Sequence, residues 1–174
     1  MSLQKCLGVI FYKGTNKENP DSILFDNLVC KVTKSRFSHV ELVLYKTESG
    51  KYLCYSSSHR DRGVRFTEID IDSGHWVFMK PNNPPTLNEV YNFDKKYGHS
   101  KYDYLGLLST VIPKGRINID NRMFCSELVG DVFNIRKPYR LSPQSLFEQF
   151  NKEESWQKFQ WDGLIHLKAY LWIR

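Results

Sequence analysis

Residues 37–44 read FSHVELVL, a short stretch with the alternation of a β-strand. Because successive side chains of a strand point to opposite faces, Phe37, His39 and Glu41 are expected to share one face. An imidazole and a carboxylate on one face have the chemistry of a general base and the group that orients it. The competing interpretation is a half-exposed strand with polar residues near its end. The stretch therefore predicts a strand that carries a candidate base, His39.

Further strands are predicted on both sides of this stretch. Short apolar or β-branched runs bounded by turn-forming residues occur at 7–12, 51–57, 64–66 and 76–79. Residues 48–50 supply a turn, so 37–45 and 51–57 are expected to form a hairpin. The prolines at Pro81, Pro84 and Pro85 are expected to end this sheet-forming half.

A helix is predicted between the first two strands. Asn19, Pro20 and Asp21 have the order of an N-cap, a first-turn proline and a first-turn acid. Apolar residues then recur at helical spacing, at positions Ile23, Leu24, Leu28 and Val32.

The remainder of the chain is predicted to be mainly helical. Thr86 and Glu89 form a capping-box pattern that opens a helix to about Tyr97, where Gly98 supplies a stop. Helices are also expected at 102–111, 123–133 and 143–150, with a loop at 113–121. The apolar stretch 164–173 is interrupted by two polar residues and is expected to be a terminal core element. Together these elements predict an α+β fold.

Size and composition favour one domain spanning residues 1–174. The chain is 41% hydrophobic and 14% aromatic, enough for one sizeable core. No apolar run reaches the roughly 20 residues needed to cross a bilayer, and no signal-peptide pattern occurs at the start. The sequence therefore predicts a soluble protein, cytoplasmic or otherwise intracellular, without a membrane span.

Cysteine usage and charge exclude two further classes of function. The four cysteines, Cys6, Cys30, Cys54 and Cys125, are far apart and lack zinc-ligand spacing, so free thiols and no metal are expected. The net charge of +6 is spread along the chain, without a basic stretch interleaved with stacking aromatics. No cofactor and no specific nucleic-acid partner are expected, and the oligomeric state is left open.

Cys125 is the candidate nucleophile. It lies in MFCSELV, residues 123–129, shortly after a loop and in the opening turns of a predicted helix. Unpaired backbone N–H groups and the helix dipole favour a thiolate at such a position. The competing interpretation is a small buried cysteine that packs beside Phe124 and Leu128.

The order of four segments resembles a known family. FSHVELVL at 37–44, CYSSSHRDRGVRF at 54–66, YDYLGLLS at 102–109 and FCSELV at 124–129 are similar to the circularly permuted NlpC-like branch of papain-fold cysteine hydrolases, near its YiiX-like and poxviral members. The similarity spans roughly Cys6 to Phe150. In that branch the histidine strand precedes the cysteine helix, as His39 precedes Cys125 here. The resemblance implies an antiparallel sheet packed against helices, with the nucleophile at a helix start.

The resemblance leaves the third catalytic residue open. Family members place a His, Asn, Gln or Glu on the strand after the histidine strand, but this region reads Leu53–Ser57, without such a residue. Glu41 is the preferred substitute, although residues i and i+2 are separated by roughly 6.6 Å of strand rise. The alternatives are Ser56, Ser57 or His59. Glu127, two residues after Cys125, is expected to tune the helix start or form an ion pair.

Two tyrosines and a reaction follow from the same resemblance. Tyr102 and Tyr104 precede the nucleophile as tyrosines do in similar enzymes, which implies a hydrogen bond in the site or a place along the substrate cleft. The implied activity is a cysteine peptidase or amidase that acts on peptides or peptidoglycan-type amides through an acyl-enzyme thioester. The alternatives are a lipid or small-molecule acyltransferase or thioesterase on the same fold, and a binding module without catalysis.

Overall fold

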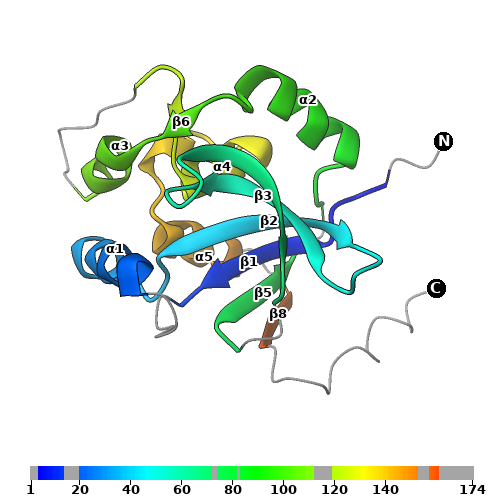
Figure 1. The fold of residues 1–174 in the computed structure, drawn as a ribbon, viewed down its shortest axis with the longest axis horizontal. Helices are drawn as coiled ribbons and strands as arrows, with labels where there is room; N and C mark the ends of the chain where they lie inside the picture. The colour runs from blue at the N-terminus through cyan, green and yellow to red at the C-terminus, as the bar shows by residue number, and fades with distance from the viewer. Residues whose placement is uncertain are drawn as a thin grey trace.

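A single eight-stranded sheet dominates the structure (Figure 1). The computed structural model describes residues 4–13, 20–71, 74–81, 83–111, 119–152 and 157–160. The strands are β1 (Gly8–Tyr12), β2 (His39–Lys46), β3 (Tyr52–Ser58), β4 (Gly63–Ile69), β5 (Trp76–Lys80), β6 (Lys101–Tyr102), β7 (Arg122–Met123) and β8 (Gln157–Gln160). Their order is β7-β6-β4-β3-β2-β1-β5-β8, and every pairing is antiparallel except the parallel pair β6–β7. The predicted α+β class with a mostly antiparallel sheet is confirmed.

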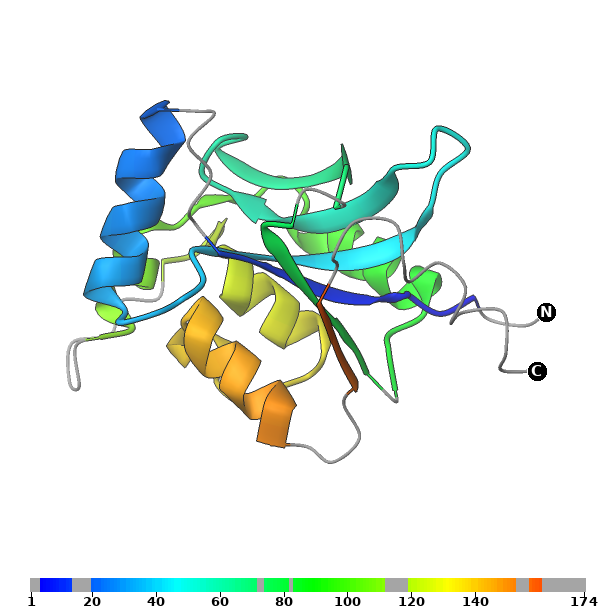
Figure 2. The same ribbon diagram turned by 90° about the horizontal axis from the view of Figure 1, so that it is seen from below.

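Five α-helices and one 3₁₀ helix are described with this sheet. They are α1 (Pro20–Val32), α2 (Leu87–Tyr97), α3 (Tyr104–Ser109), α4 (Cys125–Val132), the 3₁₀ helix η1 (Pro138–Arg140) and α5 (Pro143–Lys152). Figure 2 shows α4 and α5 together beneath the central strands, with α1 at one end of the sheet. The main core lies between the central strands and helices α4 and α5. It includes Phe11, Val40, Leu42, Leu44, Leu128, Val129, Leu146 and Phe147. The sheet and α4 are therefore joined by apolar packing directly beside the first residue of α4, Cys125.

The start of α2 follows the predicted capping box. The Thr86 side chain accepts a hydrogen bond from the Glu89 backbone N–H at 3.3 Å, and the Thr86 backbone N–H donates to Glu89 Oε2 at 2.7 Å. Gly98 is the C-cap and donates to the Asp94 carbonyl. Local capping chemistry thus determined both ends of this helix, as the sequence predicted.

The sheet continues beyond the proline cluster, contrary to the expectation that Pro81, Pro84 and Pro85 end it. Strands β6, β7 and β8 all follow these prolines. Tyr102, predicted to begin a helix, belongs to β6, and α3 begins only at Tyr104. A two-residue strand has no periodicity in sequence, because only its backbone partners define it.

Two predicted apolar faces are also wrong in detail. In α1, Leu24 is 76% exposed, whereas Phe25 and Val29 pack with Tyr102 and Phe124. Phe37 lies with the core on the α4 side and does not share a face with His39 and Glu41. The reason is that β2 begins at His39, so strand alternation does not extend back to Phe37.

Some predictions lie outside the described residues. These are the Asn19 cap, most of the 113–121 loop and the apolar stretch 164–173. Within the described part of the chain, no helix combines the length and the apolar character needed to cross a membrane.

Candidate active site

Cys125 is held at the junction of β7 and α4. It is the first residue of α4, after the extended N-cap residue Phe124, and it is completely buried. The preceding segment is anchored through the Met123 carbonyl, which accepts hydrogen bonds from Ser57 Oγ at 2.6 Å and from the Asp103 N–H at 3.1 Å. The thiol therefore lies where the N–H groups of the first helical turn lack intrahelical acceptors.

His39 lies between Cys125 and Glu41. Its ring interacts with the Cys125 side chain, which raises the pKa of His39, and its Nε2 atom lies 2.6 Å from Glu41 Oε1. Because Nε2 faces the carboxylate, Nδ1 is the ring nitrogen left for the sulfur. The side chains of His39 and Glu41, at i and i+2 of one strand, lean together across the separation that made this contact uncertain from sequence. The structure thus brings the three predicted catalytic residues into one continuous chain of contacts.

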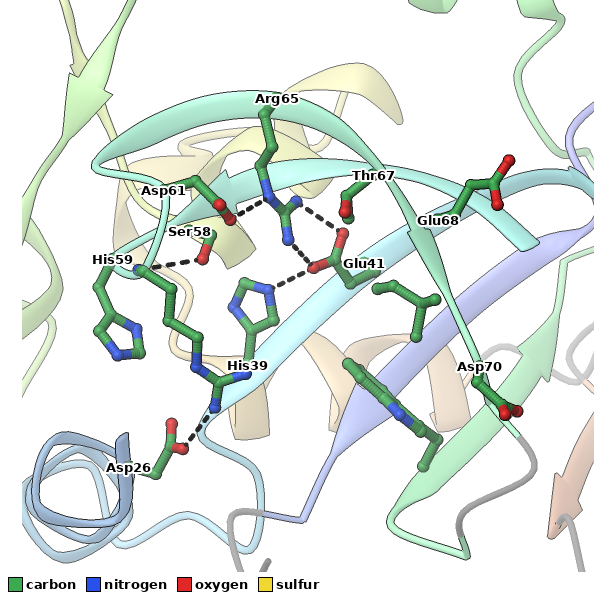
Figure 3. A pocket seen from close by; sticks show the side chains of 13 residues that line it. Asp26, His39, Glu41, Ser58, His59, Asp61, Arg65, Thr67, Glu68 and Asp70 are labelled. Atoms are coloured by element: carbon green, nitrogen blue, oxygen red, sulfur yellow. Dashed lines mark hydrogen bonds and ion pairs between the residues drawn. The ribbon is translucent and has the colours of Figure 1, made fainter. Parts of the chain in front are cut away.

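Glu41 is in turn held by Arg65 of β4. Arg65 Nη1 donates to Glu41 Oε2 at 2.8 Å, and Nη2 contacts Glu41 Oε1. Arg65 Nε donates to Asp61 Oδ2 at 2.8 Å. Figure 3 shows the Glu41 carboxylate between the guanidinium and the imidazole. The site therefore contains a bidentate arginine–carboxylate pair behind the histidine.

The pKa values of the two central groups follow from these contacts. Burial alone would raise the pKa of Glu41, but Arg65 and then His39 outweigh it and lower that pKa to about 2. Burial alone would lower the pKa of His39, but the charges of Glu41 and Cys125 raise it to about 9. An anionic Glu41 beside a cationic His39 is the expected state near neutral pH.

The three alternatives for the third residue have other contacts. Ser56 Oγ donates to the Val40 carbonyl at 2.7 Å, and Ser57 Oγ donates to the Met123 carbonyl. The His59 ring lies against Phe25, with ring centroids 4.1 Å apart, and burial lowers its pKa to about 4. Each serine hydroxyl therefore donates to a backbone carbonyl, and His59 is a neutral aromatic neighbour of the site.

The two predicted tyrosines are in different environments. Tyr102 is 2% exposed, and burial together with the neighbouring Cys125 raises the pKa of its hydroxyl well above the ordinary value. Tyr102 on β6 pairs with Met123 on β7, and Met123 lies two residues before Cys125 in the chain. Tyr104 is 42% exposed, and its hydroxyl donates to the His59 carbonyl at 3.4 Å. Tyr102 is thus a buried neighbour of the nucleophile, and Tyr104 lies at the surface beside it.

A cavity of about 360 Å³ opens onto the histidine side of this chain of contacts (Figure 3). Its lining includes His39, Glu41 and Arg65, together with Asp26, His59, Asp61 and Trp76. Across the described ranges, no group of three or more His, Cys, Asp or Glu side chains is arranged to hold a metal ion.

Comparison with known proteins adds no family assignment. A scan against protein-family models gives no match, and a search of curated proteins finds no significant relative. The functional argument therefore depends on the residues of the site.

Glu127 is a buried acid next to the nucleophile, on the first turn of α4. It accepts a hydrogen bond from the Phe124 N–H at 3.4 Å, in agreement with the prediction that it tunes the helix start. Burial, with smaller contributions from Asp103 and Asp131, raises its pKa to about 7. In the unfolded chain this carboxyl ionises near its ordinary value of 4.5. Folding therefore becomes less favourable as the pH rises from 4.5 to about 7.

Glu127→Gln is expected to stabilise the protein at alkaline pH. The amide carbonyl can still accept from the Phe124 N–H but carries no charge to bury. The free energy of unfolding should rise by on the order of 1–3 kcal/mol at about pH 8 and change little at about pH 4. Urea unfolding at both pH values measures this difference. The control is Glu48→Gln at an exposed position, which should change the free energy of unfolding by no more than about 0.5 kcal/mol. Equal stability of parent and Glu127→Gln at about pH 8 would contradict the assignment.

Proposed function

We propose that this chain is a cysteine-dependent hydrolase of the permuted NlpC-like, papain-fold type, which cleaves an amide bond. One observation carries the proposal: Cys125, at a helix start, interacts with the ring of His39 strongly enough to raise the pKa of that histidine, and His39 is itself paired with the buried Glu41. A nucleophile, a base and an orienting carboxylate in this order have the arrangement of a catalytic triad.

The proposed reaction has two steps. In the resting site His39 has already taken the proton of Cys125 and is cationic, and the thiolate attacks the amide carbonyl carbon to form a C–S bond. N–H groups of the first turn of α4 stabilise the oxyanion, and the imidazolium gives its proton to the amine as the C–N bond breaks. His39 then deprotonates water, which attacks the thioester carbonyl. The C–S bond breaks, the carboxylic acid leaves and the thiolate–imidazolium pair is restored.

The proposed substrate class is a peptide or a peptidoglycan-type amide. It follows from the family resemblance of the four sequence segments and not from the shape of the cavity. The acyl acceptor in the proposal is water, because hydrolysis needs no second binding site.

The alternative function is a binding module that keeps the fold without catalysis. The observation that favours it is the complete burial of Cys125, which has 0% of its surface exposed. For catalysis, the side chains that cover the thiol must move to admit a substrate. Reactivity of the thiol in the folded protein separates the two functions.

An electrophilic acyl-type probe is expected to label Cys125 selectively in the folded protein. Burial raises the pKa of Cys6 to about 12 and that of Cys30 to about 11, and it raises the pKa of Cys54 well above its ordinary value. These three thiols therefore remain protonated, and labelling of Cys125 at about pH 6 should be at least about tenfold faster than labelling of any of them. Mass spectrometry of digested protein identifies the labelled residue.

The control is Cys125→Ala, which should lose this rapid labelling and keep its fold. If Cys125 stays unlabelled in folded parent protein while denatured protein reacts at all four cysteines, the binding module is the better explanation. Equal labelling of all four thiols in the folded state would also contradict the hydrolase proposal.

A further inference from the structure

Arg65 reaches the candidate triad from a strand that is not its neighbour. It lies on β4, whereas His39 and Glu41 lie on β2, and β3 runs between them. The residue paired with Arg65 on β3 is Ser56, whose hydroxyl donates to the Val40 carbonyl. A short side chain turned into the backbone leaves space for the guanidinium to cross β3. The Arg65 guanidinium can therefore contact Glu41 from two strands away.

The contacts of Arg65 orient both oxygens of the Glu41 carboxylate. Nη1 donates to Oε2 and Nη2 contacts Oε1, the oxygen that also faces His39 Nε2. The Glu41 side chain is 1% exposed and that of Arg65 16% exposed, so water competes little for these bonds. Asp61 holds the far side of the guanidinium through Nε. The fork geometry determines the plane of the carboxylate in a way that a single point charge would not.

We propose that Arg65 is a positioning residue for the triad, which aims the Glu41 carboxylate at His39 and keeps it ionised. This inference rests on the proposed function, because it assigns a role in setting up the Cys125–His39 pair. Without Arg65, a carboxyl as buried as Glu41 would favour its neutral form. A neutral Glu41 would no longer stabilise the imidazolium of His39, and the neutral thiol–imidazole form would gain population.

A plain structural ion pair is the competing explanation for the same contacts. Burial and pairing alone predict a loss of stability when Arg65 is replaced, with no effect on the titration of His39. Several charged or titratable groups surround His39 and are the background against which its titration is measured: Glu41 on β2, Cys125 on α4, Tyr102 on β6, Arg65 on β4, Asp26 on α1, and His59, Arg60 and Asp61 between β3 and β4. Within the described residues, Arg65 alone among these groups makes two contacts with the Glu41 carboxylate.

The test compares Arg65→Met with the matched control Arg60→Met, both in the full chain. Arg60 donates to the buried Asp26 at 3.0 Å, so the control also removes an arginine from a buried carboxylate but leaves Glu41 paired. Three quantities are measured for each variant: the pKa of His39 by NMR titration of its ring, the rate of Cys125 alkylation by iodoacetamide against pH, and the melting temperature.

Arg65→Met is expected to lower the pKa of His39 and to slow alkylation at about pH 6 by about tenfold, with the rate profile displaced to higher pH. Arg65→Lys keeps the positive charge but cannot make the two parallel contacts of a guanidinium. Its His39 pKa and alkylation rate should therefore lie between those of the parent and of Arg65→Met. Arg60→Met should lower the melting temperature but leave the His39 pKa and the alkylation profile as in the parent. In a Glu41→Gln background, Arg65→Met should produce no further shift of the profile.

Two results would overturn the proposal. One is an Arg65→Met variant that loses stability like Arg60→Met while its His39 pKa and alkylation profile match the parent. The other is a full effect of Arg65→Met in the Glu41→Gln background. If Arg65→Met does not fold, Arg65→Lys decides: a parental His39 pKa and profile in that variant, where the fork is lost, would also overturn it. If Cys125 is inert in the parent protein, the hydrolase proposal fails, whereas the His39 titration still tests the role of Arg65.

Discussion

His39→Ala is expected to slow alkylation of Cys125 near neutral pH by about 10²- to 10⁴-fold and to reduce any amide turnover in parallel. The charges of Glu41 and Cys125 raise the pKa of the imidazole to about 9, so it is cationic near neutral pH. Removing it deletes both the proton acceptor and the charge that stabilises the thiolate. Iodoacetamide alkylation against pH, followed by mass spectrometry of the labelled residue, measures the loss.

His59→Ala is the matched control for this prediction. His59 lines the same cavity but is held against Phe25, and its low pKa keeps it neutral. This variant should keep an alkylation profile close to that of the parent. A larger effect of His59→Ala than of His39→Ala would show that His39 is not the base. Reactivity of Cys125 at the parental rate in His39→Ala would show that the reaction needs no histidine base.

Phe11→Ala is expected to lower the free energy of unfolding by about 3–5 kcal/mol. Phe11 of β1 is completely buried, and its ring packs against Phe37, Phe147 and Phe150 at centroid distances of 5.4, 5.2 and 6.4 Å. Truncation would leave a cavity between β1 and α5 that these three rigid aromatic neighbours cannot readily fill. A loss of this size is a large part of the about 5–15 kcal/mol that stabilises a typical domain. Urea unfolding monitored by circular dichroism measures the change.

Leu24→Ala supplies the contrast for this core substitution. The Leu24 side chain on α1 is 76% exposed, so its truncation removes little buried surface. Its effect should stay within about 0.5 kcal/mol. Similar losses for the two variants would mean that the aromatic cluster does not pack as described.

The strands that carry the site were predictable because they are long enough to show a local pattern. Residues 37–45, 51–57, 64–66 and 76–79 correspond to β2, β3, β4 and β5 within a few residues. The capping box of α2 and a helix with Cys125 in its opening turns were predicted on the same local grounds, although α4 begins at Cys125 and not at Met123, which belongs to β7. The two-residue strands β6 and β7 were not, because backbone pairing alone defines them.

Arg65 is the functional candidate that the sequence did not indicate. It lies in a strand of mixed polarity, where an arginine is ordinarily a solvated side chain. What could have indicated a role for Arg65 is the face of the sheet on which it lies. Arg65 pairs with Ser56 across the strands, which places its side chain on the face from which His39 and Glu41 project. That register depends on the length of the β3–β4 turn and could not be assigned from periodicity. An arginine two strands from a candidate triad is therefore found only when the sheet is assembled.

By itself, the sequence determined the α+β class, the strand that presents His39 and Glu41, and a helix with Cys125 in its opening turns. These features arise from interactions between residues close in the chain, whose periodicity and caps are visible in the order of residue types. Tertiary structure alone decided that Glu41, and not Ser56, Ser57 or His59, contacts His39, that Tyr102 is a buried neighbour of Cys125, and that Arg65 holds Glu41. The physical reason is that these contacts join strands and helices far apart in sequence, and their geometry depends on strand order, register and side-chain direction, which no local pattern encodes.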